Sequence, residues 1–206
     1  MDKIYSVLAI GFIVIMILSL NGVIYYNKYY AEKEPCSALK LVGEGNIGGK
    51  FNLIDENNNF VSEREAIDKP SLIYFGYTFC PDVCPLDAVR NAEAVDLLYA
   101  KGFELKPIFV TIDPDRDTPE VLLDFTDAIH PEMLGLTGSA KQIKAISQAY
   151  KTYYRKQVSE DEYYLVDHST YSYLVTPEKG FVDFFRRDES ALKIAEKIAC
   201  HLKDSL

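Results

Sequence analysis

Two cysteines, Cys80 and Cys84, are separated by three residues in the stretch Cys-Pro-Asp-Val-Cys-Pro, and a proline follows each of them. Two thiols at this spacing can bind a soft metal ion as thiolates or close into a disulfide. Proline disfavours the helical region for the residue before it, so we expect both cysteines to lie in a loop. A loop also suits a disulfide, whose Cβ atoms approach to about 3.8 Å, closer than the ~5–6 Å between helix positions four residues apart.

The residues around the pair predict a strand before it and a helix after it. Residues 72–75, Leu-Ile-Tyr-Phe, form an apolar run typical of a strand that is buried on both faces of an α/β sheet. Pro85 suits the first position of a helix, which makes Cys84 the predicted N-cap, where the helix dipole favours an ionised thiol. The predicted buried stripe of this helix consists of Leu86, Val89, Ala92 and Val95. The alternative is a structural pair, either two small buried side chains or a structural disulfide.

Composition limits the size of the fold and the class of partner. The chain has 206 residues, of which 48% are hydrophobic, enough for one well-cored domain and an appendage. A formal net charge of -9 argues against nucleic acid and against adhesion to an anionic membrane surface. Proteins and metal ions are therefore the expected partners.

Residues 7–26 form the appendage, because they contain no charged side chain and match the about 20 residues that cross a bilayer. We expect an N-terminal transmembrane helix. A cleaved signal peptide is the alternative, but the apolar run is long for one and no clean cleavage site follows it; no organelle import leader is visible either.

The orientation of this predicted anchor rests on two conflicting signals. Lys3 precedes the span while Lys28 and Lys33 follow it, a count that by itself places the globular domain inside the cell. The cysteine chemistry instead requires a compartment in which thiols are oxidised and reduced under control. We therefore expect a single-pass protein of the inner (cytoplasmic) membrane with its globular domain on the periplasmic side.

The chain divides into three expected parts: a membrane anchor with a short flank at 1–30, a polar linker at 31–47, and a domain at 48–206. Strands alternate with helices and a hairpin follows, which predicts an α/β fold. Its central mixed sheet, parallel at first and antiparallel at one edge, is expected to be flanked by helices. Besides 72–75, the expected strands are 51–54, 60–61, 107–112, 134–136, 171–175 and 181–185. Four helices are expected: one after Cys84, one after Thr118, and two at 139–154 and 190–202.

Three motifs occur in order along this domain: Cys-Pro-Asp-Val-Cys-Pro at 80–85, Asp-Pro-Asp-Arg-Asp-Thr-Pro at 113–119, and Asp-His-Ser at 167–169. A reactive cysteine pair after a first core strand is the arrangement of the thioredoxin fold. With the other two motifs, the chain resembles the SCO/SenC family of membrane-anchored, thioredoxin-like copper chaperones, which serve the binuclear copper site of cytochrome c oxidase. The resemblance covers roughly residues 48–202 and the anchor.

The resemblance implies a copper site, for Cu(I) or Cu(II), made by Cys80, Cys84 and His168. It implies the copper-bearing subunit of cytochrome c oxidase as the recipient, with another copper chaperone or a thiol reductase as a further partner. Ligand softness agrees, since thiolates select Cu(I) and an imidazole suits either valence. Asp113 and Asp117 match carboxylates that lie near the family's site without being ligands; the alternative for them is a solvated turn that caps a helix.

Other readings of the same residues stay open. A lone histidine such as His168 is often structural, although the thioredoxin fold would turn its loop toward the cysteines. The protein could instead be a thiol-disulfide oxidoreductase, with Cys80 as nucleophile and Cys84 as resolving thiol, or a redox sensor. We expect chiefly a metal chaperone.

Two histidines and two cysteines lie outside these motifs. His130 and His201 are expected in solvent near helix ends, and Cys36 and Cys200 either form a bridge or stay free.

Overall fold

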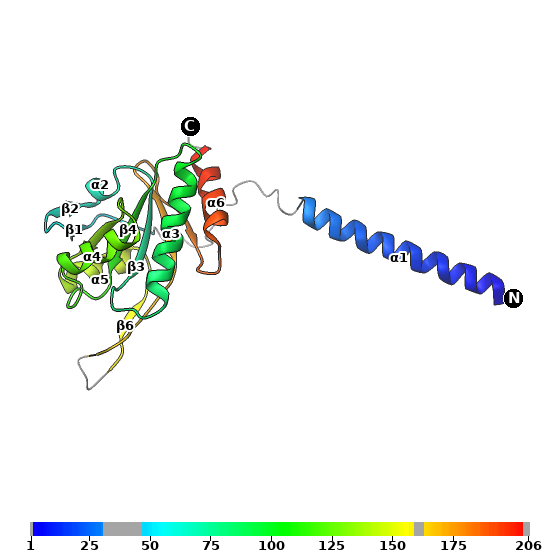
Figure 1. Cartoon of the computed structure of the whole chain (residues 1–206), viewed down its shortest axis with the longest axis horizontal. Helices are drawn as coiled ribbons and strands as arrows, with labels where there is room; N and C mark the ends of the chain where they lie inside the picture. The colour runs from blue at the N-terminus through cyan, green and yellow to red at the C-terminus, as the bar shows by residue number, and fades with distance from the viewer. Residues whose placement is uncertain (1, 31–46, 159–162, 204–206) are drawn as a thin grey trace. The chain divides into compact units, whose positions relative to one another are not determined.

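The computed structural model describes residues 2–30, 47–158 and 163–203, and the chain separates into two compact units, Met1–Ser37 and Ala38–Leu206. The first unit contains helix α1 (Asp2–Tyr30; Figure 1). Its described apolar side chains are exposed. Across the described ranges, no helix reaches the combination of length and hydropathy that a membrane crossing requires. The transmembrane helix predicted at 7–26 is therefore not confirmed. Nearly all of the predicted linker, 31–46, lies outside the described residues.

The second unit is built on a seven-stranded mixed sheet, as the sequence predicted, with the order β2-β1-β5-β4-β3-β8-β9. Apolar runs buried along their length form its parallel centre, made of β3 (Ser71–Gly76), β4 (Lys106–Thr111) and β5 (Leu134–Thr137). Antiparallel strands lie on both edges rather than on the single edge expected: β1 (Asn52–Asp55) and β2 (Phe60–Ser62) on one side, β8 (Ser172–Thr176) and β9 (Gly180–Phe185) on the other.

Helices cover both faces of this sheet. The two that lie side by side, α3 (Val83–Tyr99) and α6 (Ala191–Lys203), share an apolar cluster with Leu72 and Leu174 (Figure 1). Because side chains alternate along a strand, Phe75 points to the opposite face, where its ring packs against Tyr150 at the end of α5 (Ala140–Ala149). The remaining helices are α2 (Glu63–Ala66) and α4 (Pro119–Ile129), the latter capped by Thr118 as predicted.

A second sheet, missed by the sequence analysis, stands apart from the first. Its strands are β6 (Tyr154–Lys156) and β7 (Val166–His168), which pair antiparallel with each other and with no strand of the large sheet. The helix predicted to continue to residue 154 ends at Ala149, because Lys151 adopts a positive φ of 56° and Thr152 N–H bonds back to Ser147 O at 2.9 Å. This is a Schellman motif, in which the residue with positive φ is usually glycine. Here that residue is a lysine, so the sequence carries no glycine to mark the end of the helix.

Candidate metal centre

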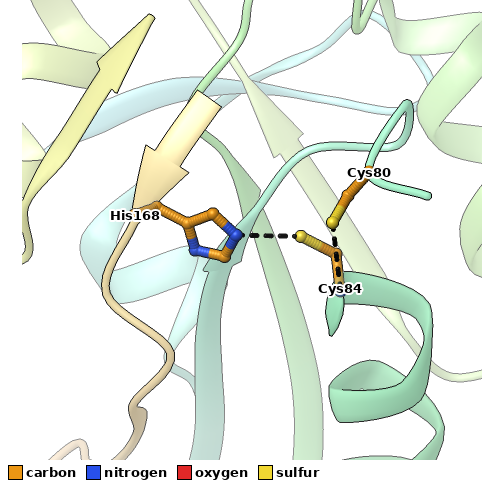
Figure 2. Close-up of side chains that lie close together, drawn as sticks. All are labelled: Cys80, Cys84 and His168. Carbon is orange, nitrogen blue, oxygen red and sulfur yellow. Dashed lines mark hydrogen bonds between the residues drawn. The ribbon is translucent and has the colours of Figure 1, made fainter. Parts of the chain in front are cut away.

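Three predicted site residues converge at the carboxyl end of β3. The sulfurs of Cys80 and Cys84 and a ring nitrogen of His168 all lie within 4.8 Å of one another, and within the described residues this is the one group of three such side chains close enough to hold a metal ion. Figure 2 shows Cys84 and His168 pointing at each other from helix α3 and strand β7, with Cys80 reaching in from the loop before the helix. Segments more than eighty residues apart in sequence therefore build one site.

Cys84 lies inside the first turn of α3, which corrects the predicted N-cap position. The helix begins at Val83 with Asp82 as its N-cap, while Cys80 stays in the loop as expected. Pro85 is tolerated there because the first N–H groups of a helix have no partner within it, so proline removes no hydrogen bond. One of these N–H groups, that of Cys84, is directed at Cys80 Sγ at 3.4 Å. The start of the helix thus orients both sulfurs.

The inner face of α3 is more polar than the predicted stripe. Leu86 and Val89 are 59% and 42% exposed, which contradicts their predicted burial, whereas Asp87 and Asn91 are buried. The predicted spacing was correct for Ala92 and Val95, but the two polar residues occupy the inner face nearer the cysteines. Asp87 accepts a hydrogen bond from Tyr74 Oη at 3.0 Å and pairs with Arg90 at 3.2 Å. Polar side chains on a helix normally indicate its solvent face, so no sequence signal marked this network.

Gly76, the last residue of β3, lets the helix start approach the strand. A Cβ at this position would lie 2.8 Å from Tyr74 Cε1 and 3.0 Å from Cys84 Sγ. The strand therefore has room for the Cys84 sulfur only because the residue beneath it has no side chain.

The two thiols differ in their electrostatics. The hydrogen bond from the Cys84 side chain is the main reason that the pKa of Cys80 falls far below a thiol's usual range; His168 and the N–H groups of Asp82 and Cys84 add to the effect, against burial. Burial raises the pKa of Cys84, and the contact with Cys80 raises it further. Cys80, 8% exposed, is therefore the thiolate, and Cys84, fully buried, keeps its proton. This reverses the expectation that the helix terminus would ionise Cys84.

His168 turns its Nε2 toward the cysteines. Its Nδ1 lies 2.8 Å from the carbonyl oxygen of Ser169, which can only accept, so Nδ1 carries a proton. The other ring nitrogen, Nε2, faces Cys84 Sγ at 3.2 Å. The rings of Tyr74 and Tyr77 meet the imidazole edge-on, with centroids 6.3 and 5.9 Å away. The bond from Nδ1 to a backbone carbonyl holds the ring in the orientation that a metal-binding imidazole needs.

Asp113 and Asp117 are fully buried, which excludes the alternative of a solvated turn for both. Asp117 accepts hydrogen bonds from the backbone N–H of Thr78 at 3.0 Å and from its hydroxyl at 2.6 Å, and a third from Thr111 Oγ1. Thr78 lies two residues before Cys80, so Asp117 fixes the segment that carries this cysteine. Asp113 faces the β6–β7 hairpin instead, where Tyr164 Oη donates to it at 2.7 Å.

The remaining candidate residues lie away from the centre. His201 pairs with Asp183 at 2.9 Å and His130 with Asp96 at 3.3 Å, and both histidines are half-buried, so neither is the solvent-exposed histidine expected. Cys200 is disulfide-bonded, which removes the alternative of a free thiol at this position. Cys36, its candidate partner in the sequence analysis, lies outside the described residues.

A hollow of about 270 Å³ borders the centre between Cys80 and His168. Its lining comes from Tyr77 and residues 80–83 around the first cysteine, from residues 165–168 and Thr170 around the histidine, and from Gln157. The site is therefore open on the side of Cys80 and closed on the side of Cys84.

Comparison with known proteins decides the family. The sequence model of the SCO1/SenC family matches residues 40–203, and Protein SenC of Rhodobacter capsulatus is 50% identical over 156 residues, 76% of this chain and 71% of that protein. The chain belongs to the SCO1/SenC family. Among solved members of the SCO1/SenC family, Arabidopsis thaliana ScoI with copper bound has a TM-score of 0.74 at 36% identity, covering 77% of this chain and 99% of that one.

Yeast Sco1 with copper bound has a TM-score of 0.72 at 37% identity, covering 78% of this chain and 90% of that one. These likenesses confirm the thioredoxin-like fold with a central mixed sheet flanked by helices.

Proposed function

We propose that this protein binds one copper ion through Cys80, Cys84 and His168 and delivers it to the binuclear copper site of cytochrome c oxidase during assembly of the enzyme. The observation that carries the proposal is the convergence of two sulfurs and one imidazole nitrogen within 4.8 Å. Two thiolates suit Cu(I), and the nitrogen extends the set to Cu(II).

The electrostatics of the site suit a cargo that must be both held and released. Cys80 is already a thiolate and faces the hollow, whereas Cys84 must lose its proton when copper binds. Three protein ligands leave a coordination position open, through which a recipient can take the ion. The solved relatives from Arabidopsis thaliana and yeast, each with copper bound, support copper as the metal. The oxidase as recipient rests on the family resemblance.

Copper binding is tested on the reduced full chain by metal analysis and by competition with chelators for each valence. The parent should hold one equivalent. His168→Ala should keep Cu(I) on the two sulfurs while its affinity for Cu(II), which prefers a nitrogen ligand, falls by at least about 10-fold. His130→Ala is the matched control, since His130 lies away from the site. A His168→Ala protein that held both valences as tightly as the parent would contradict the ligand assignment.

Delivery is tested separately by mixing the copper-loaded chain with the metal-free, reduced copper-bearing subunit of the oxidase. The absorption of the binuclear centre should appear on the subunit as copper leaves the donor. Cys80→Ser should form no donor complex and transfer nothing. Retention of copper on the donor, with no change in the subunit, would rule out the delivery role.

A thiol-disulfide oxidoreductase is the second candidate function, and the opposite pKa shifts of the two cysteines favour it. The Cys80 thiolate would attack one sulfur of a partner disulfide and expel the other as a thiolate, forming a mixed disulfide. Cys84 would then lose its proton and attack Cys80, releasing a reduced partner and an oxidised pair, with two electrons passing to the partner. Cys84→Ser should trap the mixed disulfide, and His168→Ala should retain the exchange activity. If Cys84→Ser accumulates no mixed disulfide with the partner, this function is excluded.

We also propose that α1 anchors the chain in the inner (cytoplasmic) membrane, with the second unit on the periplasmic side. The support is the uncharged run at residues 7–26, which lies within a 29-residue helix. An impermeant thiol reagent applied to intact cells after mild reduction should label Cys80. Labelling only after lysis would mean that the second unit lies inside the cell, as the count of Lys3, Lys28 and Lys33 indicates.

A further inference from the structure

Arg116 lies against three aromatic rings beside the candidate metal centre. Its guanidinium carbon is 3.7 Å from the ring centroid of Tyr164, 4.9 Å from that of Phe79 and 5.6 Å from that of Tyr77. The side chain is mostly buried, and contacts between a cation and ring faces strengthen when water is excluded. We call this group, Arg116 with Tyr77, Phe79 and Tyr164, the arginine box.

The arginine box joins the two segments that carry the candidate ligands. Tyr77 and Phe79 belong to the segment that leads into Cys80, while Tyr164 belongs to the hairpin that leads into His168. Arg116 comes from a third place, the loop between β4 and α4. One guanidinium therefore contacts both halves of the site without touching a sulfur or the imidazole.

Tyr77 transmits the contact to His168. Its hydroxyl oxygen accepts a hydrogen bond from the Val166 N–H at 3.3 Å, two residues before His168, and its ring packs edge-on against the imidazole. Displacement of Tyr77 would therefore move both the backbone of β7 and the ring of its last residue. The arginine box therefore contacts the candidate ligand His168 through the ring of Tyr77.

Asp113 extends the same connection to the other strand of the hairpin. This buried carboxylate pairs with Arg116 Nε, accepts from Tyr164 Oη at 2.7 Å and pairs with Lys156 Nζ of β6 at 3.2 Å. The hairpin forms its own two-stranded sheet, and two strands alone are marginally stable. Its placement over the cysteines depends on such contacts with the body of the domain.

The guanidinium is positioned by the rings more than by hydrogen bonds. Arg116 Nη2 is buried and has no hydrogen-bond partner among the described residues. A buried donor without a partner lowers stability. A site that needed only a positive charge near Asp113 would therefore not favour an arginine that leaves such a donor. The flat guanidinium stacks on an aromatic face in a way that the compact ammonium of lysine does not.

We propose that Arg116 is a positioning residue of the copper site: the arginine box and Asp113 hold the β6–β7 hairpin so that His168 faces the cysteine pair. This inference rests on the proposed copper-binding function. It predicts that loosening the box affects the valence that needs the imidazole, Cu(II), more than Cu(I), which two thiolates hold. The hairpin would thereby set which form of copper the site retains.

The first test uses the metal-free, reduced full chain, so that it does not depend on copper. Arg116→Met removes the charge and the planar group while keeping an unbranched apolar chain, and Arg116→Lys keeps the charge. In both variants the amides of β7 should exchange hydrogen at least about 10-fold faster than in the parent, while those of β3 are unchanged. Arg186→Met is the control, because this exposed arginine pairs with exposed Asp188. Unchanged exchange in β7 would overturn the inference.

The second test measures copper on the same proteins. Arg116→Met should bind Cu(II) about 10- to 100-fold more weakly, as second-layer changes usually do, with reduced nitrogen coupling in its electron paramagnetic resonance spectrum and a smaller change for Cu(I). Equal losses for both valences, or an unchanged Cu(II) spectrum, would overturn the positioning role. If the parent binds copper no better than His168→Ala, the proposed function fails, while hydrogen exchange still decides whether the box holds the hairpin.

Discussion

Cys80 and Cys84 have similar neighbours in sequence but different chemical states. Each precedes a proline, yet the first receives hydrogen bonds from the second, from His168 and from backbone N–H groups, and the second is enclosed by the core. Their separate pKa values follow from these surroundings. At the scale of the residue, the site contains one thiolate and one protonated thiol.

Alkylation of the reduced, metal-free chain should report this difference. The lowered pKa keeps Cys80 ionised through pH 6 to 8, so its rate of reaction with iodoacetamide should stay nearly constant there. The rate of an ordinary thiol with a pKa of 9.0 instead falls about tenfold for each unit by which the pH is lowered. Cys84, with a raised pKa and no exposure, should not react. Mass spectrometry of the labelled peptides measures both rates.

Cys84→Ala is the control for this experiment, because it removes the main hydrogen bond to the Cys80 sulfur. The pKa of Cys80 should then rise and its alkylation should become pH-dependent. A tenfold fall per pH unit in the parent itself would show that Cys80 is an ordinary thiol.

The loop between β4 and α4 is the element that organises the site. Asp117 at its end fixes the segment before Cys80, and Asp113 with Arg116 contacts the hairpin that carries His168. A short loop at the carboxyl end of a central strand can contact both segments, because they meet above the same edge of the sheet. Its acidic residues therefore act through hydrogen bonds and not as candidate ligands.

Asp117→Ala should lower the free energy of unfolding by about 1–3 kcal/mol, because it leaves the Thr78 N–H and buried hydroxyls without their acceptor. Asp124→Ala, an exposed aspartate on α4, should change it by less than about 0.5 kcal/mol. Urea titration measures both, and equal effects would mean that the buried carboxylate does not brace the loop.

The end of α5 is the second element on which the site depends, because the chain must leave the helix at Lys151 to form β6. Lys151→Gly should raise the free energy of unfolding by about 1 kcal/mol, since glycine adopts a positive φ without the penalty of a side chain. Lys144→Gly, at an exposed position within the same helix, should lower it by about 1 kcal/mol. The prediction fails if the two glycines act in the same direction in urea titrations.

At the scale of the whole molecule, the two units have separate roles. Both apolar core clusters consist of residues of the second unit, and none of their members comes from α1. A domain with its own core should fold independently of the segment that precedes it. The site, which lies wholly in the second unit, should then form there as well.

Removal of residues 1–30 should therefore leave a soluble chain that unfolds cooperatively and keeps the near-ultraviolet circular dichroism of packed tyrosines. The comparison is with the full chain in detergent, measured at the same concentration of chain. A molten spectrum or insolubility of the shortened chain would show that α1 contributes to the fold itself.

The sequence alone determined the class of fold and most of its elements, because those depend on local patterns. Buried strands such as 72–75 are continuous apolar runs, and helix starts such as Thr118-Pro119 have their own chemistry. The same local rules misjudged the starts and ends where tertiary contacts prevailed. Pro85 stands within a helix that begins before it, and Lys151 ends a helix without glycine.

The candidate site divides in the same way. Residue type indicated Cys80 and Cys84, since few side chains can bind a soft metal, and the resemblance to the SCO/SenC family added His168. Only the tertiary structure decided which sulfur is ionised, which histidine nitrogen faces the cysteines and why Asp113 and Asp117 are buried. The arginine box could not be predicted at all, because it brings together side chains from three segments far apart in the chain, and an electrostatic or aromatic contact depends on distance in space rather than on spacing in sequence.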